Sequence, residues 1–192
     1  GVVLNGDGTI TVPAGVTAFT VTVPTTQDTI DEADETVPLT VGGVAATGTI
    51  VDDDAPPELS VANVSVNESA GTLSFTVSLS APSEQTVSVS YATATGSATA
   101  ADFTGVAGSL SFAPGVTSQT ITVPITDDLI DEFDESFSVE LSAPVNASIA
   151  DGSATGTIVD NDDPPTVVSV DPGASGDTVP EGTDLVYTVT LS

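Results

Sequence analysis

The 192-residue chain contains no lysine, arginine or histidine. It carries 28 aspartates and glutamates, so its formal net charge is -28. About a quarter of the residues of an ordinary protein are charged, and both signs are represented. Because no cationic side chain is available to neutralise phosphates, nucleic acids and anionic membrane surfaces are not expected as partners. A chain of this charge needs either a counter-ion or a very salty solvent.

The sequence also lacks cysteine, methionine and tryptophan, and no apolar run approaches the about 18 residues that a membrane-spanning helix needs. Membrane insertion is therefore not expected, and neither is a signal peptide, whose n-region is basic. Disulfides, thiolate metal sites, catalytic triads and Schiff bases are excluded. A glycosidase with two catalytic carboxylates is disfavoured, because the carboxylates are too clustered and no tryptophan could stack on a sugar. We therefore do not expect an enzyme.

Hydrophobic residues make up 39% of the chain and alternate with serine and threonine. This composition argues against disorder, which requires low hydrophobicity as well as high charge. The alternation predicts half-buried antiparallel strands at residues 73–79, 87–91, 120–123 and 137–141. Glycine, proline, aspartate and asparagine separate these short segments, as is typical of an all-β sandwich.

Internal repeats are the most informative feature. The segment DTIDEADET (residues 28–36) recurs 100 positions later as DLIDEFDES, and TGTIVD (residues 47–52) recurs 108 positions later. A third copy opens at Pro164, in the position of Pro56, and its segment LVYTVTL (residues 185–191) matches LSFTVSL in the second copy. The chain is therefore predicted to contain a tandem array of similar units.

The offsets divide the chain into three parts: the C-terminal half of a first sandwich (residues 1–55), a complete sandwich (56–163) and the N-terminal strands of a third (164–192). As an alternative, the ends of two chains could complete one sandwich head to tail. Such a unit would lack the strand around residues 87–93, so we favour a piece of a longer polypeptide. The expected partners are neighbouring repeats of the same chain, with identical chains in a filament as a further candidate.

Carboxylates gather in the repeated acidic loop and in the segments DDDAPP and DNDDPP, which close each unit. Loops at one end of a sandwich converge, and clustered carboxylates repel one another unless a cation lies among them. Ca²⁺ takes six to eight oxygen ligands in flexible loops, whereas a softer metal would recruit histidine or cysteine. We therefore predict Ca²⁺ sites; a solvated acidic loop on a salt-adapted surface is the alternative.

The motif DDxxxExxE, followed by FxVxL and then GTIVDxDD, resembles the Calx-β repeat, and so does the opening VNESAG at residues 66–71. The resemblance covers residues 57–163 and the matching halves on either side. It implies tandem seven-stranded, immunoglobulin-like β-sandwiches that bind Ca²⁺ in loops at one end, near the junction to the next domain.

The resemblance also implies the ligand positions. The first copy has Gln27 where the complete repeat has Asp127, so it is expected to hold fewer ions or to bind them more weakly. The implied ligands of the complete repeat are Glu68, Asp102, Asp127, Asp128, Glu132, Glu135, Asp160, Asp162 and Asp163. The first copy retains Asp28, Glu32, Glu35, Asp52, Asp53 and Asp54, and the third copy retains Glu181.

These features predict a Ca²⁺-rigidified spacer, similar to the extender repeats of large bacterial adhesins, in an extracellular or cell-surface protein from a saline environment. Ca²⁺ at each junction would stiffen the joint. One alternative is a regulatory Ca²⁺ sensor, the role of Calx-β units in sodium/calcium exchangers. Another is an adhesin tip, which the near-duplication of units disfavours because a tip is usually unique.

Overall fold

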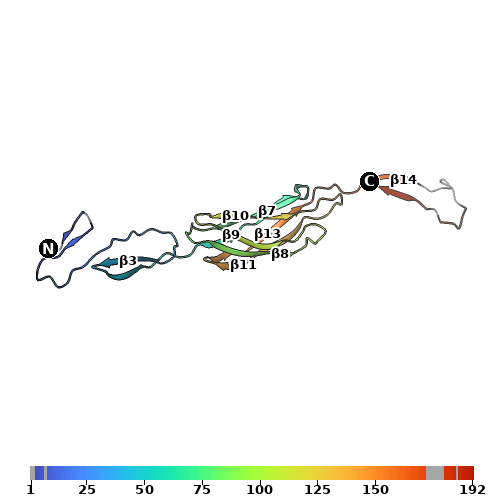
Figure 1. The fold of residues 1–192 in the computed structure, drawn as a ribbon. Helices are drawn as coiled ribbons and strands as arrows, with labels where there is room; N and C mark the ends of the chain where they lie inside the picture. The colour runs from blue at the N-terminus through green and yellow to red at the C-terminus, as the bar shows by residue number, and fades with distance from the viewer. Residues whose placement is uncertain (1–2, 7, 172–179, 185) are drawn as a thin grey trace. The chain divides into compact units, whose positions relative to one another are not determined.

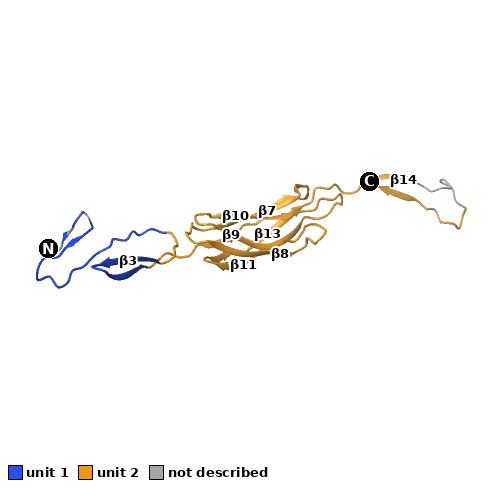
Figure 2. Cartoon of the chain, in the orientation of Figure 1, with its two compact units in different colours: residues 1–29, 35–50 blue, residues 30–34, 51–192 orange. Residues whose placement is uncertain are grey.

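The structure is a computed structural model that describes residues 3–6, 8–171, 180–184 and 186–192 (Figure 1). The chain forms two compact units (Figure 2). Unit 1 comprises Gly1–Thr29 and Glu35–Ile50, and unit 2 comprises Ile30–Asp34 and Val51–Ser192. Unit 2 therefore contains the whole complete repeat together with a five-residue segment of the first acidic loop.

The complete repeat is a sandwich of two facing sheets (Figure 1), as the sequence predicted. One sheet has the strand order β10-β7-β5-β12 and the other has the order β6-β13-β11-β8-β9. All four predicted strands are confirmed, and they lie in β7, β8, β10 and β11. The strands are β5 (Glu58–Val61), β6 (Val64–Asn67), β7 (Thr72–Leu79), β8 (Val87–Thr95), β9 (Ala107–Phe112), β10 (Ser118–Pro124), β11 (Glu135–Val145), β12 (Ser148–Asp151) and β13 (Ser153–Val159).

The seven expected strands occur as nine segments, because the first and last strands each pass from one sheet to the other. β5 and β6 are successive parts of the first strand, and they pair in parallel with β12 and β13, the two parts of the last. Gly152 lies at the second interruption, where an added Cβ would meet Ile149 Cγ2 at 2.8 Å. Parts of the first and last strands thereby form one edge of each sheet, β12 in one and β6 in the other, and the opposite edges are β10 and β9.

The core follows from the alternation of apolar and polar residues. In β7, Leu73, Phe75 and Val77 are fully buried, while the serines and threonines between them face outward. The ring of Phe137 from β11 meets Phe75 edge-on at 5.9 Å and stacks on Phe103 at 4.2 Å. All the buried hydrophobic residues found among the described residues belong to this one sandwich.

The strand directions define two ends of the sandwich. β7 and β10 are antiparallel, with Ser78 opposite Ser118 and Thr72 opposite Pro124. The loop after β7 (residues 80–86) and the loop after β10 (residues 125–134) therefore lie at opposite ends. We call the end that carries residues 125–134 the acidic end and the other the β7–β8 end.

The described residues of unit 1 include two antiparallel hairpins and a stretch without regular structure at residues 12–29. The first joins β1 (Val3–Leu4) to β2 (Ile10–Thr11), and the second joins β3 (Glu35–Val41) to β4 (Val44–Ile50). In unit 2, β14 (Val167–Asp171) pairs with β15 (Thr188–Leu191). β15 confirms the last four residues of the strand predicted at residues 185–191, residues 186 and 187 form no strand, and residue 185 lies outside the described residues. Over the described ranges, no helix is long and apolar enough to cross a membrane.

Candidate metal centre

Five chain segments converge at the acidic end and bring carboxylates together around one pocket. They are the turn after β6, the segment before β9, the loop after β10, the start of β11 and the segment after β13. Thr126, Phe133 and Ile158 also line the pocket. The carboxylates that line it are Glu68, Asp102, Asp128, Glu132, Glu135 and Asp160.

Six carboxylates at this end form two groups that could each hold an ion. One group is Glu68, Asp128 and Asp162, and the other is Asp102, Glu132 and Glu135. Within each group, one oxygen from every residue lies within 4.8 Å of the others. Ca²⁺ binds oxygen at about 2.3–2.6 Å, so oxygens at this separation can share one ion.

Glu68 is positioned by the turn that the VNESAG segment forms. Asn67 Oδ1 accepts a hydrogen bond from Ser69 N–H and caps a short 3₁₀ helix (η1, Glu68–Ala70), and Gly71 ends it with a left-handed backbone. Glu68 is only 6% exposed, and its Oε1 accepts the Asp128 N–H at 2.8 Å. This bond ties the acidic loop to the first strand, so the first carboxylate group is held by two elements.

Asp102 is fixed by its own loop. Burial opposes its ionisation, but the Thr99 backbone N–H and hydroxyl, which donate to Asp102 Oδ2 at 2.6 and 2.9 Å, hold the pKa of Asp102 below its usual value. Asp102 O also accepts the Thr126 N–H at 2.8 Å. Asp102 is therefore an ionised, preoriented member of the second group.

The other two members of that group are destabilised as anions. Burial, together with a hydrogen bond and repulsion from Asp102, raises the pKa of Glu135 from 4.5 to about 7. Desolvation and the charge of Asp128 raise the pKa of Glu132 as well. No cationic side chain exists in the sequence to relieve this repulsion, so only protons or a bound cation can do so.

The segment after β13 presents two carboxylate oxygens with no hydrogen-bond partner. Asp160 Oδ1 and Asp162 Oδ2 are buried, and neither accepts a hydrogen bond from any described residue. Desolvation and the charge of Asp160 raise the pKa of Asp162. Buried polar atoms almost always have a partner. These two oxygens therefore fit a cation better than they fit a solvated loop.

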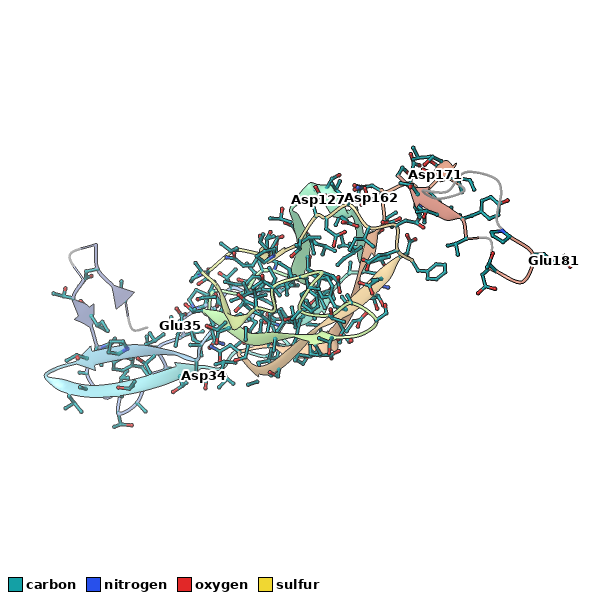
Figure 3. The ribbon with its side chains drawn as sticks, turned by 90° about the vertical axis from the view of Figure 1, so that its right-hand side faces the viewer. Asp34, Glu35, Asp127, Asp162, Asp171 and Glu181 are labelled. Atoms are coloured by element: carbon teal, nitrogen blue, oxygen red, sulfur yellow. The ribbon has the colours of Figure 1, made fainter. Side chains whose placement is uncertain are left out.

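The structure places most of the predicted ligands of the complete repeat in this cluster. Asp127 lies in neither carboxylate group, but its charge contributes to the raised pKa of Asp162, and the two residues lie at the same end (Figure 3). Asp163 is exposed and also belongs to neither group. Residues 126–134 form a loop with no helix, as expected of a ligand-bearing segment.

The predicted ligands of the first copy are divided between the two units. Asp28 and Glu35 belong to unit 1, whereas Glu32 and the Asp52, Asp53 and Asp54 run belong to unit 2. Within unit 2, Asp52 Oδ2 accepts the Glu32 N–H at 3.1 Å. None of these residues joins a carboxylate group among the described residues, and neither does Glu181, which is exposed in a turn.

Sequence reasoning missed one residue in each acidic loop. Asp134 Oδ1 accepts the Asp160 N–H at 3.3 Å, and Asp34 Oδ1 accepts the Asp52 N–H at 3.1 Å in the first copy. The two loops therefore fix the closing segment in the same way. The recurrence of this aspartate in both acidic motifs was a signal of its role. Asn161 was also missed as a functional residue; its Oδ1 accepts the Ser69 N–H at 3.1 Å.

The donor set of the cluster consists of oxygen atoms alone. The oxygens come from five separate segments, which suits a hard divalent cation that tolerates irregular coordination. With no histidine or cysteine in the sequence, a softer metal would find none of its preferred ligands. Glu68, Asp128, Asp160 and Asp162 would hold an ion at the closing segment, and Asp102, Glu132 and Glu135 would hold another.

Comparison with known proteins agrees with this geometry. The sequence profile of the Calx-beta domain matches residues 4–54 and 51–162. The apo-form Calx CBD1 domain is 30% identical, with a TM-score of 0.52, and the match covers 55% of this chain and 98% of that domain. The calcium binding domain CBD12 of CALX1.1 is 32% identical, with a TM-score of 0.50, over 55% of this chain and 46% of that one.

The Calx CBD2 domain is 20% identical, with a TM-score of 0.50, and the match covers 52% of this chain and 84% of that domain. At this identity the likeness concerns the fold alone. No curated protein matches the chain significantly.

Proposed function

Because the chain belongs to the Calx-beta domain family, we propose that its complete repeat binds Ca²⁺ at the acidic end. We propose further that it serves as a non-catalytic spacer in a large extracellular or cell-surface protein. Two relatives of at least 30% identity are calcium-binding or CBD domains. The oxygen-only cluster with two unpartnered buried carboxylate oxygens supports the same ion in this chain.

One observation carries the spacer role: Asp162 belongs both to the carboxylate cluster and to the linker. It shares a group with Glu68 and Asp128 of the sandwich. It also lies two residues before Pro164-Pro165, and tandem prolines are stiff and extended. A ligand at this position connects the segment that leaves the sandwich to the sandwich itself.

Repulsion among the carboxylates determines whether the linker is held at the acidic end or released from it. Bound Ca²⁺ supplies the positive charge that the chain lacks. Without it, Asp162 repels Asp160 and Asp128, and this repulsion favours movement of the linker away from the acidic end. With the charges balanced, the carboxylates of Asp160 and Asp162 can both remain at the acidic end, and the linker keeps one position. The Ca²⁺-bound acidic end then limits movement of the linker to the next repeat.

The composition supports a location with abundant Ca²⁺ and salt. A net charge of -28 without any cation is compatible with solvents that screen charge strongly. Extracellular modules bind Ca²⁺ with Kd values of about 10⁻⁴–10⁻³ M. We therefore propose a secreted or surface-bound protein of a saline environment, with neighbouring repeats as its structural partners.

A Ca²⁺ sensor is the second candidate, because the similar structures include a calcium-binding CBD12. Sensors bind Ca²⁺ at about 10⁻⁷–10⁻⁵ M. A calcium titration separates the two functions: a Kd near 10⁻³ M supports the spacer, whereas a Kd of about 1 µM or below supports the sensor.

The spacer role is tested by distance measurements across the joint. The chain has no cysteine, so Ser109→Cys in β9 and Thr190→Cys in β15 provide two unique sites for spin labels. We expect a narrow distance distribution in Ca²⁺ and a broad one after chelation with EGTA. The control pair Ser109→Cys and Thr122→Cys lies within the sandwich and should not change. An equally broad distribution for the first pair in both conditions would exclude the spacer role.

A further inference from the structure

The five-residue segment Ile30–Asp34 contacts the β7–β8 end of the complete sandwich. Asp31 is 5% exposed and Ser83 is 3% exposed. The Ser83 hydroxyl donates to Asp31 Oδ2 at 2.7 Å, and Gln85 Nε2 approaches the same oxygen at 3.5 Å. This carboxylate is therefore buried with polar partners from the following repeat, and it is not among the predicted Ca²⁺ ligands.

The backbone takes part in the same contact. Asp31 and Ser83 form a parallel β-bridge, and the Glu84 N–H donates to Asp31 O at 3.0 Å. Gln85 Nε2 donates to Glu32 O at 3.1 Å, and the Gln85 N–H donates to Ser83 Oγ at 3.0 Å. Serine and glutamine two residues apart thus satisfy both the side chain and the backbone of the acidic loop. Such a contact depends on residue type as well as on proximity.

An apolar contact accompanies these hydrogen bonds. Ile30 is half-buried and lines a recess together with Pro82 and Pro114, which also belong to the β7–β8 end. The equivalent residue of the next acidic loop, Ile130, is 61% exposed. This isoleucine is therefore partly covered by the following repeat in the first acidic loop and exposed to solvent in the second.

The acidic loop of the complete repeat has Ile130, Asp131 and Glu132 at the positions of Ile30, Asp31 and Glu32, and these residues have no such cover. It has Leu129 and Phe133 where the first copy has Thr29 and Ala33. Asp131 is exposed, and the neighbouring Leu129 and Phe133 are 90% and 93% exposed. This loop lies at the end of the sandwich opposite to residues 80–86, as the pairing of β7 with β10 requires. A contact between one end and the opposite end of the next unit is heterologous, so it can be repeated along a chain of units.

We propose that the acidic loop of each repeat is a docking element for the repeat that follows. Asp31 is the residue that docks in the first copy, and the surface formed by Leu129, Ile130, Asp131 and Phe133 is the same element in the second. Its partner is the loop equivalent to residues 81–85 in another repeat of this kind. Serine and glutamine at the positions of Ser83 and Gln85 recognise the aspartate. The docking residues belong to neither of the two carboxylate groups, and of them only Phe133 also lines the pocket of the proposed Ca²⁺ site.

A disulfide test examines the first copy in the full chain. Asp31→Cys with Ser83→Cys introduces the only two thiols, and paired bridge positions lie close enough for a disulfide. We expect most of the chain to form the intramolecular disulfide under mild oxidation, in Ca²⁺ and in EGTA alike. The control pair Asp131→Cys with Ser83→Cys spans the two ends of one sandwich and should stay reduced within the chain. Equal yields for the two pairs would overturn the proposal.

The unaltered protein provides a second measurement if the cysteine variants fold poorly. The Glu84 amide donates to Asp31 O, so its hydrogen exchange should be at least tenfold slower than that of an unstructured amide. Asp31→Gly should remove this protection and leave the amides of β11 unchanged. Exchange of the Glu84 amide at the unstructured rate in the unaltered protein would overturn the proposal.

The second copy is tested by lengthening the chain. A second copy of residues 56–163 placed directly after Asp163 provides the missing partner loop, and this sandwich has its own buried core. With Asp131→Cys in the first sandwich and Ser83→Cys in the added one, we expect the same disulfide and reduced exposure of Phe133. A failure of this disulfide while the Asp31 pair forms would overturn the assignment of the Asp131 surface.

Discussion

The tetrapeptide TGTI occurs twice, at residues 47–50 in β4 of unit 1 and at residues 155–158 in β13 of unit 2. In unit 2, Ile158 is buried, and an added Cβ on Gly156 would meet the rings of Phe75 and Phe137 at 2.8 and 2.9 Å. In unit 1, Ile50 is half-buried, and a Cβ on Gly48 would meet only Val37 O, at 3.9 Å. The same sequence thus takes a core position in one place and a loosely packed position in the other.

A second contrast concerns a whole strand. Residues 118–124 form β10 because they pair with β7 along seven positions. The equivalent residues 18–24 form no strand, and among the described residues before them there is no counterpart of β7. Their alternating pattern is similar, yet Phe19, Val21 and Val23 are exposed. A strand pattern therefore becomes a strand only where a partner strand and an opposite sheet are present.

The largest expected difference between the two units comes from truncating a core ring. Phe137→Ala removes the side chain that packs on Phe75 and Phe103, which should cost about 3–5 kcal/mol of unfolding free energy. Val37→Ala, at the equivalent position of unit 1, should cost less than about 1 kcal/mol because Val37 is only half-buried. Urea unfolding followed by circular dichroism measures both. Similar costs would show that unit 1 has a core comparable to that of the sandwich.

Substitution of the two equivalent glycines, Gly156 and Gly48, is expected to change the stability less. Gly156→Ala should destabilise the protein by about 1–3 kcal/mol, because the new methyl group overpacks the two phenylalanine rings. Gly48→Ala should be neutral or slightly stabilising, because its methyl group enters open space and alanine loses less backbone entropy. Thermal unfolding of the two variants compares them directly. A neutral Gly156→Ala would contradict the close approach of β13 to the core.

The smallest effect is a pH dependence in the Ca²⁺-free protein. The pKa of Glu135 is raised from 4.5 to about 7, first by burial and then by Asp102, so the protonated form favours the folded state. The stabilisation from this group is complete below about pH 4.5 and is lost as the pH rises through about 7. The melting temperature without Ca²⁺ should therefore fall over this range, and Glu135→Gln should flatten the decline. An unchanged slope in the variant would contradict this assignment.

Much of the fold could be predicted because it depends on local patterns. The alternation in residues 73–79 and 137–141 identified β7 and β11, and the acidic motif identified the loop that carries Asp128, Glu132 and Glu135. The division of the first and last strands between two sheets could not be predicted, because it depends on pairings between segments far apart in the sequence. The unpartnered oxygens of Asp160 and Asp162 and the burial of Asp31 depend on the same long-range packing.

The sequence placed potential ligands in all three copies, with fewer in the first and third than in the complete repeat. Among the described residues, the structure forms groups of three carboxylates in the complete repeat. A site built from five segments requires all five to be present. Motif spacing identifies residues of the right chemistry, but only the closed sandwich brings Glu68, Asp102 and Asp162 to one end.

Thermal unfolding with and without Ca²⁺ tests the central claim, that the acidic end of the complete repeat holds Ca²⁺. At about 100 times Kd, each independent site adds roughly 2.7 kcal/mol. For a domain of this size, 1 kcal/mol shifts the melting temperature by about 4–8 °C. Two sites therefore predict a fall of about 20 °C or more when EGTA removes the ion, and Glu68→Gln should reduce that difference while Asp28→Asn leaves it unchanged. A melting temperature that is the same in Ca²⁺ and in EGTA would contradict the account.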